Sequence, residues 1–393
     1  MFRPRMVYAV AAFAGLLAGY AAPASAENGV SADKITFGQA AALEGPASAL
    51  GKGMRAGIFA AFEEANRNGG VHGRKLELVS RDDGYEPDRS IAETKRLIDE
   101  DKVFALIGAV GTPTSAATQP ISTAGGVPFI GAFTGAGFLR DPKLENVINV
   151  RASYGAETES WIKHLTEDLK VSKIAIFYQD DAFGRAGLDG VKAALAKRNM
   201  ELVAEGTYER NTVAVKSALL ALKRAEPEAV VMVGAYKPCA EFIKLSRQTD
   251  FNPVFVNISF VGASALAKEL GSEGAGVIVS QVVPFPWDSS LKVVADYQAA
   301  IKAVDPEAEP EFVSLEGYLV GRLVVAALEK AGSDPTRAGL LDSIKQTGKF
   351  DVGGLEMTYG PSKNTGLDQV FLTVIQADGK FKPVERLGKM SSN

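Results

Sequence analysis

Histidine and cysteine are scarce in this 393-residue chain, which holds two histidines and one cysteine. The lone Cys239 excludes an intrachain disulfide, and His72 and His164 are too few and too far apart for a catalytic triad or a metal cluster. Neither the Gly-x-Ser-x-Gly pattern nor a cysteine-rich metal spacing occurs. We therefore expect no catalytic residues, no metal and no cofactor, and we expect Cys239 to be a buried apolar side chain.

Basic runs and nucleotide-binding loops are also missing. The 43 Lys and Arg residues are outnumbered by 47 Asp and Glu residues, and no basic block is present to neutralise phosphates, which disfavours nucleic acid as a partner. Gly51-Lys52-Gly53 lacks the Ser or Thr that follows the lysine of a phosphate-binding loop. Its next glycine, Gly57, comes one place too late for a dinucleotide fingerprint.

Long apolar runs are absent except at the N-terminus. Arg3 and Arg5 precede an apolar run over residues 6–22, and Ala24-Ser25-Ala26 then supplies the small-x-small pattern of a signal peptidase site. We expect a signal peptide over residues 1–26, cleaved after Ala26, and therefore an exported protein. An uncleaved membrane anchor is the alternative, which the shortness of the run and its two glycines disfavour.

From residue 35 onward, short β-branched runs alternate with amphipathic helical stretches. Such alternation is typical of a parallel sheet covered by helices on both faces, so the expected fold class is α/β. A second series of the same kind begins after the expected strand at residues 147–150. Because the chain is longer than one hydrophobic core usually supports, we expect two doubly wound lobes.

The last part of the chain changes character. Helices are expected over residues 288–303, 312–331 and 336–347, followed by a closing β-hairpin over residues 370–377 and 381–384 with Asp378-Gly379 as its turn. Helices that follow the second series must return to the first lobe. We therefore assign residues 28–150 plus 284–357 to lobe 1 and residues 151–283 plus 358–393 to lobe 2.

Small and hydroxyl residues follow two expected strands of the first series. The run over residues 103–110 leads into residues 111–118, which include Ser115, and the run over residues 127–133 leads into Thr134-Gly135-Ala136-Gly137. Small side chains let a ligand approach the backbone, while hydroxyls and the free N–H groups of a helix's first turn can hold a carboxylate. This is binding chemistry. The acid pairs Asp82-Asp83 and Asp180-Asp181 each follow a strand, where Asp usually caps a helix or turn.

A set of short motifs, in order over most of the chain, resembles the extracellular substrate-binding proteins of branched-chain amino-acid ABC transporters, the leucine/isoleucine/valine-binding family. The motifs are Leu43-Glu-Gly-Pro46, Asn66-Arg-Asn-Gly-Gly-Val-His-Gly73, Ser115-Ala-Ala-Thr-Gln-Pro120, Phe133-Thr-Gly-Ala136, Leu139-Arg-Asp-Pro142, Asp180-Asp-Ala-Phe-Gly184 and Gly234-Ala-Tyr236.

This resemblance implies a type I periplasmic binding fold, with two lobes joined by three hinge crossings and closing on a small-molecule solute. It also implies a periplasmic location, a membrane permease as partner and no enzymatic activity. The matching carboxylate-binding positions are Ser115 and the Phe133-Thr134-Gly135 segment. The matching aromatic wall positions are Phe183, Tyr236 and Phe312, and Leu50 lies where family members often carry an aromatic residue.

The chain departs from the family pattern at Ser259, where the amine-binding carboxylate would fall. A serine cannot neutralise a buried ammonium group, which is costly without a charged partner. Either another acid, such as Asp181 or Glu316, substitutes for it, or the ligand lacks a free amine. The expected solute is thus an amino acid, an aromatic or aliphatic carboxylate, or an amide. A ligand-sensing receptor of the same fold, which signals to a partner protein, is the alternative function.

Overall fold

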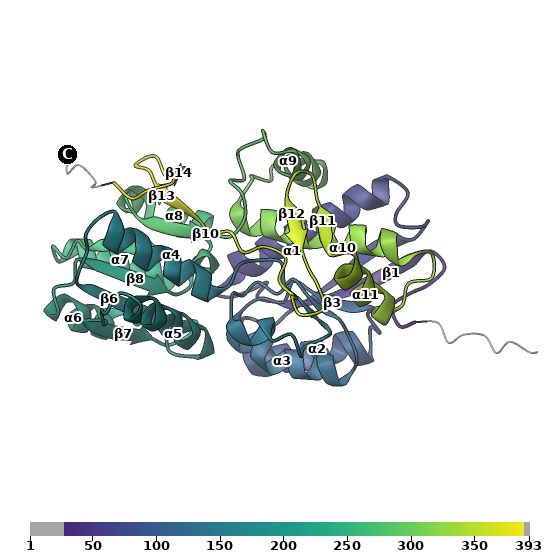
Figure 1. Ribbon diagram of the computed structural model, residues 1–393, viewed down its shortest axis with the longest axis horizontal. Helices are drawn as coiled ribbons and strands as arrows, with labels where there is room; N and C mark the ends of the chain where they lie inside the picture. The colour runs from purple at the N-terminus through teal and green to yellow at the C-terminus, as the bar shows by residue number, and fades with distance from the viewer. Residues whose placement is uncertain (1–26, 389–393) are drawn as a thin grey trace, which may run out of the picture.

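The chain folds into two α/β lobes, each built around one main sheet (Figure 1). The computed structural model describes residues 27–388, so the expected signal peptide and its cleavage after Ala26 lie outside the described residues. Within residues 27–388, no helix has both the length and the apolar character needed to cross a bilayer.

The first lobe contains a five-stranded sheet in the order β2-β1-β3-β4-β5, with every pair parallel. Its strands are β1 (Lys34–Ala41), β2 (Lys75–Asp82), β3 (Ala105–Ile107), β4 (Phe129–Ile130) and β5 (Val147–Ile148). The first series supplies α1 (Ser48–Arg67), α2 (Pro87–Asp99) and α3 (Thr112–Ala124), and α9 (Lys292–Val304), α10 (Phe312–Ala331) and α11 (Arg337–Thr347) return to this lobe. The backbones of helices α1 and α10 are in close contact at Gly57. A Cβ atom at this position would lie only 1.9 Å from the carbonyl oxygen of Ser314, so only glycine fits there.

The second lobe contains a seven-stranded sheet in the order β14-β13-β10-β9-β8-β6-β7. Its strands are β6 (Ile174–Gln179), β7 (Ala204–Tyr208), β8 (Ala229–Val233), β9 (Val254–Asn257), β10 (Ile278–Gln281), β13 (Phe371–Ile375) and β14 (Phe381–Val384). Its helices are α4 (Tyr154–Glu167), α5 (Ala182–Ala196), α6 (Lys216–Arg224), α7 (Tyr236–Gln248) and α8 (Ala263–Leu270). The β13–β14 hairpin joins antiparallel to β10, which confirms the predicted closing hairpin as an edge feature.

The chain passes between the two sheets three times: after β5, after β10 and before β13. The third passage runs beside the first, since Thr365 forms a parallel bridge with Asn149 and the Leu367 N–H donates to the Val150 carbonyl at 2.8 Å. The predicted fold class, two parallel-sheet lobes joined by three crossings, is confirmed. The exact lobe limits, residues 28–150 plus 284–357 and 151–283 plus 358–393, stay a prediction.

Two strands of the first lobe are shorter than the sequence predicts. Residues 103–110 and 127–133 were expected as strands, but only β3 and β4 form ladders, and Val110 and Phe133 meet in an isolated bridge. Gly108 and Gly131 interrupt the runs, because both have positive φ angles, 63° and 61°. A further small hairpin, β11 (Lys349–Asp351) with β12 (Glu356–Thr358), was not expected.

Candidate functional site

The nine residues that the sequence singles out lie at strand ends and helix beginnings, and all nine are buried. Phe133, Thr134 and Gly135 follow β4. The others open helices: Leu50 in α1, Ser115 in α3, Phe183 in α5, Tyr236 in α7, Ser259 in the short 3₁₀ helix η2 (Ser259–Val261) and Phe312 in α10. Because the carboxyl ends of parallel strands meet at one sheet edge, this placement brings residues from both lobes toward one another.

An inner aromatic cluster, formed by Tyr85, Phe133, Tyr154, Phe183 and Phe260, joins the two lobes. The ring of Phe260 lies 5.2 Å from that of Phe133, 4.5 Å from that of Phe183 and 5.9 Å from that of Tyr85, measured between centroids. The rings of Tyr154 and Phe183 are 5.5 Å apart. The predicted residues Phe133 and Phe183 are thus brought together through Phe260, which the sequence did not single out.

Leu50 and Tyr236 also lie at the contact between the lobes. A Cβ atom on Gly262 would come within 2.5 Å of a Leu50 methyl group, so Leu50 packs directly on the turn that precedes α8. The Tyr236 hydroxyl accepts the N–H of Ala49 at 3.4 Å. The start of α1 therefore contacts the second lobe at two neighbouring points.

Buried hydroxyl groups gather at the end of β4 and the start of α3. The Thr134 and Thr112 hydroxyls form a hydrogen bond of 2.7 Å. The hydroxyls of Ser115 and Tyr154 are buried and have no hydrogen-bond partner among the described residues. Burial raises the pKa of Tyr154, and the Arg151 guanidinium, followed by the neighbouring Thr134 hydroxyl, opposes that rise. Buried hydroxyls without partners are costly, and a ligand oxygen would satisfy them.

A buried ionic cluster, formed by Arg151, Glu157, Ser259 and Glu316, lies against the inner aromatic cluster. The Arg151 guanidinium is 4.7 Å from the centroid of the Phe133 ring, 3.8 Å from the Glu157 carboxylate and 3.5 Å from that of Glu316. It also contacts the Ser259 hydroxyl. The backbone N–H and the hydroxyl of Ser259 both donate to Glu157, each at 2.9 Å.

Burial and pairing set the charges of this cluster. Burial raises the pKa of the Glu316 carboxyl to about 7, although the Arg151 guanidinium opposes the shift. Burial acts to lower the pKa of Arg151, but the carboxylates of Glu316 and Glu157 outweigh it and raise that pKa. The guanidinium therefore stays charged, while the charge of Glu316 varies around neutral pH.

The two acids that the sequence offered as partners for an amine are both committed elsewhere. Asp181 caps α5 by accepting the Phe183 N–H at 2.9 Å, and it pairs with Arg210 at 3.0 Å. Glu316 faces Arg151. The acid that lies beside Ser259 is Glu157, which the sequence reasoning missed.

Tyr154 and Glu157 were missed because the sequence reasoning did not place a helix start at Ser153. Ser153 caps α4 by accepting the Ala156 N–H at 3.1 Å, so the helix starts at Tyr154. This cap places Tyr154 and Glu157 in the first turn, beside the end of the first crossing. A serine before an acid-containing turn is the signal that could have found them.

Phe312 lies in a second aromatic group rather than beside Phe183 and Tyr236. Its ring is 6.0 Å from Phe285, 5.5 Å from Trp287 and 5.6 Å from Phe381, measured between centroids. Trp287 and Phe381 are stacked at 5.7 Å with their planes 14° apart. The aromatic side chains are therefore divided between two separate groups.

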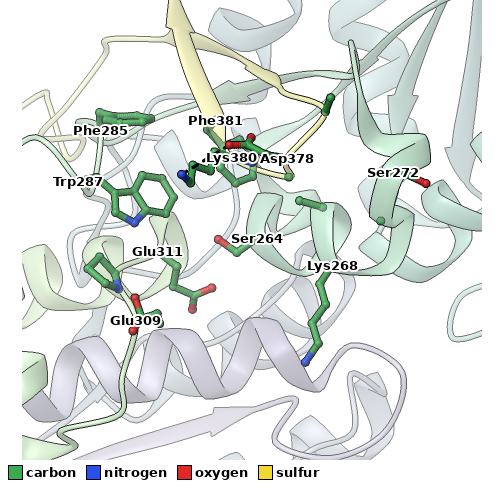
Figure 2. Close-up of a pocket in the computed structure, with 15 residues that line it drawn as sticks. Ser264, Lys268, Ser272, Phe285, Trp287, Glu309, Glu311, Asp378, Lys380 and Phe381 are labelled. Carbon is green, nitrogen blue, oxygen red and sulfur yellow. Dashed lines mark hydrogen bonds and ion pairs between the residues drawn. The ribbon is translucent and has the colours of Figure 1, made fainter.

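An outer cavity of about 920 Å³ adjoins this second group and is bordered by both lobes. Figure 2 shows Ser264, Trp287 and Glu311 around the same space. Burial raises the pKa of the Glu311 carboxyl to about 7, and among residues 27–388 this carboxylate has no ion-pair partner. None of the nine predicted residues lines this cavity.

Polar contacts also join the lobes near the inner aromatic cluster. Glu86, in the first lobe, accepts from Arg210 at 2.8 Å and from Asn211 at 2.6 Å, both in the second lobe. The Gln179 side chain donates to the Tyr85 hydroxyl at 3.1 Å. The two lobes are thus in direct contact, an arrangement that we call closed.

The arrangement of hydroxyls and ring faces is suited to holding a small molecule. Cys239 is buried, and burial raises the pKa of its thiol far above its usual range, so it is an inert packing residue as expected. The described residues include no group of three or more His, Cys, Asp or Glu that could hold a metal ion. Hydroxyls, ring faces, two guanidinium groups and two carboxylates are the chemistry present between the lobes.

Comparisons with known proteins agree with this geometry. The family model described as "Periplasmic binding protein" matches residues 34–380. The chain is 27% identical over 362 residues to the Leu/Ile/Val-binding protein homolog 7 of Brucella suis biovar 1, covering 88% of this chain and 87% of that protein.

Solved structures of periplasmic binding proteins are also similar to this chain. The crystal structure of a possible leucine/isoleucine/valine-binding protein from Rhodopirellula baltica SH 1 is 40% identical and covers 90% of this chain and 96% of its own, with a TM-score of 0.85. A substrate-binding periplasmic protein from Ralstonia solanacearum is 26% identical, covers 89% and 99%, and has a TM-score of 0.84.

Proposed function

Because the chain belongs to the periplasmic binding protein family, we propose that it is the extracytoplasmic solute-binding component of an ABC importer. The family consists of non-enzymatic solute-binding proteins of the periplasm, so a substrate-binding role follows from membership. The proposal adds that the solute is an amino acid or a related small carboxylate or amide, and that a membrane permease receives it. Export by a signal peptide cleaved after Ala26 is part of the same prediction.

The observation that carries the proposal is the set of buried polar groups between the lobes. The unpartnered hydroxyl of Tyr154 lies beside the Thr134 hydroxyl, and Arg151 and the inner aromatic cluster adjoin it. The unpartnered hydroxyl of Ser115 lies at the start of α3. The first lobe contributes the hydroxyls of Ser115 and Thr134, and the second lobe contributes Tyr154, Phe183 and Phe260. A solute that touches both lobes favours the closed form over the open one, which is binding by population shift.

A thermal-shift screen of the chain from residue 27 tests the proposal. The panel comprises amino acids, aromatic acids, short aliphatic carboxylates and amides. A ligand that binds only the native state raises the melting temperature by mass action, so a hit is visible before its binding mode is known. We expect at least one hit that binds with one molecule per chain in calorimetry.

Two results would contradict the proposal. One is a panel without any hit at millimolar concentration, where even a weak solute would stabilise the fold. The other is conversion of a bound compound into a product, detected by chromatography after long incubation, since a transport receptor must release its solute unchanged.

A further inference from the structure

Two buried guanidinium groups, those of Arg151 and Arg140, lie near each other and near two carboxylates, those of Glu157 and Glu316. Arg151 is 1% exposed and pairs with Glu157 and Glu316. Arg140 donates to backbone carbonyls, at 2.8 Å to Ala136 and 2.9 Å to Arg151, and has no carboxylate within ion-pair distance among the described residues. Burial lowers the pKa of Arg140 to about 10, so it stays charged at neutral pH.

Neither carboxylate of the cluster is free to receive another cation. Glu157 accepts the N–H and the hydroxyl of Ser259 and also the Ser280 hydroxyl at 2.5 Å. Burial raises the pKa of Glu316 to about 7, so this carboxyl carries less negative charge at neutral pH than an exposed glutamate does. An incoming ammonium group would therefore meet Arg151 as a like charge, without a carboxylate left to neutralise it.

The unused hydrogen-bonding capacity at this point is mainly that of donors. The Nη1 atom of Arg151 and the hydroxyls of Ser115 and Tyr154 have no hydrogen-bond partner among the described residues, whereas the Nε atom of Arg151 faces the Glu316 carboxylate at 3.5 Å. The unpartnered acceptors are the side-chain oxygens of Asn149 and Asn257, which are neutral amides. A site with a buried cation and open donors satisfies a negatively charged oxygen, and it leaves an ammonium unpaired.

We infer that the solute is a carboxylate that carries no ammonium group and has an apolar or aromatic body. The carboxylate would take the open donors, and the body would contact the inner aromatic cluster. This inference rests on the proposed function, because it assumes that the solute binds between the lobes. It decides between the two possibilities that Ser259 leaves open in the sequence.

Matched pairs of compounds that differ only in the ammonium group test the inference. The pairs are leucine with 4-methylpentanoate and phenylalanine with 3-phenylpropanoate, each titrated into the chain from residue 27 by calorimetry. In the pair whose apolar body fits the site, we expect the compound without the ammonium group to bind at least about tenfold more tightly than its amino acid. The reason is that an unpaired buried charge is costly. An amino acid that binds as tightly as its partner, or more tightly, overturns the inference.

The pH dependence of binding gives a second, independent measurement. Glu316 is faced by Arg151, Arg140 and Glu157, and it competes with the solute for Arg151 only when it is ionised. Affinity for the carboxylate should therefore fall between pH 6 and pH 8, as Glu316 loses its proton. Glu316→Gln should abolish this slope. The matched variant Glu311→Gln, which changes a buried acid with the same pKa of about 7 beside the outer cavity, should keep it.

The outcomes separate the inference from the proposed function. If amino acids bind and their partners without the ammonium do not, the solute-binding function stands and the inference fails. If the slope disappears in Glu311→Gln and persists in Glu316→Gln, the solute lies in the outer cavity and the inference fails. If no compound of any class binds, the proposed function fails. Because the matched pairs are measured on the unmodified chain, the test does not depend on either variant folding.

Discussion

Replacing Glu86 with alanine should shift the lobes from the closed toward the open arrangement. Glu86 belongs to the first lobe, and its carboxylate holds Arg210 at 2.8 Å and Asn211 at 2.6 Å in the second lobe. After the change, Arg210 keeps Asp181 as a partner within its own lobe. The substitution thus removes contacts between the lobes without leaving an unpaired cation.

The expected size of the effect follows from the exposure of these groups. The side chains of Glu86 and Arg210 are 41% and 22% exposed, so solvent screens the pair and each of the two lost contacts contributes about 0.5–1 kcal/mol. Together they amount to about 1–2 kcal/mol, which changes the ratio of open to closed molecules about 5- to 30-fold. Added salt should reduce this difference, because the pair is partly exposed.

Energy transfer between dyes measures the change, with one introduced cysteine in each lobe. The native Cys239 is buried and will not react with the dyes. Asp180→Ala is the matched control, since it removes an ion pair of the same length, 2.8 Å to Arg185, that lies within the second lobe. An open fraction in Glu86→Ala equal to that of Asp180→Ala, at low salt, would refute the reasoning.

Other changes have equally definite outcomes. Ser115→Ala and Thr134→Val should each weaken the binding of a carboxylate solute by about 1–3 kcal/mol in calorimetry, because the charged carboxylate loses a hydrogen-bond donor. Unchanged affinity in both variants would show that these residues lie outside the site. Gly57→Ala should destabilise the fold by about 1–3 kcal/mol in denaturant unfolding, since α1 touches the α10 backbone there. Gly137→Ala, where a Cβ atom meets nothing within 4 Å, should have little effect, and equal losses in the two variants would contradict the packing argument. The thiol of Cys239 should react with a disulfide reagent only in denaturant, and fast labelling of the native chain would show that it is not buried.

The alternation of strands and helices could be read from the sequence because each element has its own periodicity. Helix α10 has the limits expected for it, and the β13–β14 hairpin follows from its turn residues. The ends of β3 and β4 could not be read, because the φ angles of Gly108 and Gly131 depend on packing far along the chain. The three-residue strands β11 and β12 are too short to show a period at all.

The polar part of the candidate site was predictable where it follows strand ends, as at Ser115 and Thr134. The buried ionic cluster as a whole was not, because its members come from three separate segments: residues 151–157, Ser259 and Glu316. Ser259 and Glu316 were singled out one by one, but no sequence pattern places them beside Arg151 and Glu157. Only the folded chain shows that these groups neutralise one another. The same holds for Phe312, whose neighbours Trp287 and Phe381 lie on either side of it in the sequence.

The two tryptophans of the chain stand in contrasting surroundings. Trp161 is fully buried in the second lobe, whereas Trp287 is 39% exposed and borders the outer cavity next to the second crossing. The intrinsic fluorescence of the protein therefore has an internal reference and a reporter: the emission of Trp161 is shielded from quenchers such as iodide, while that of Trp287 is open to them. Any movement of the lobes that changes the water around the second crossing will be visible without a label.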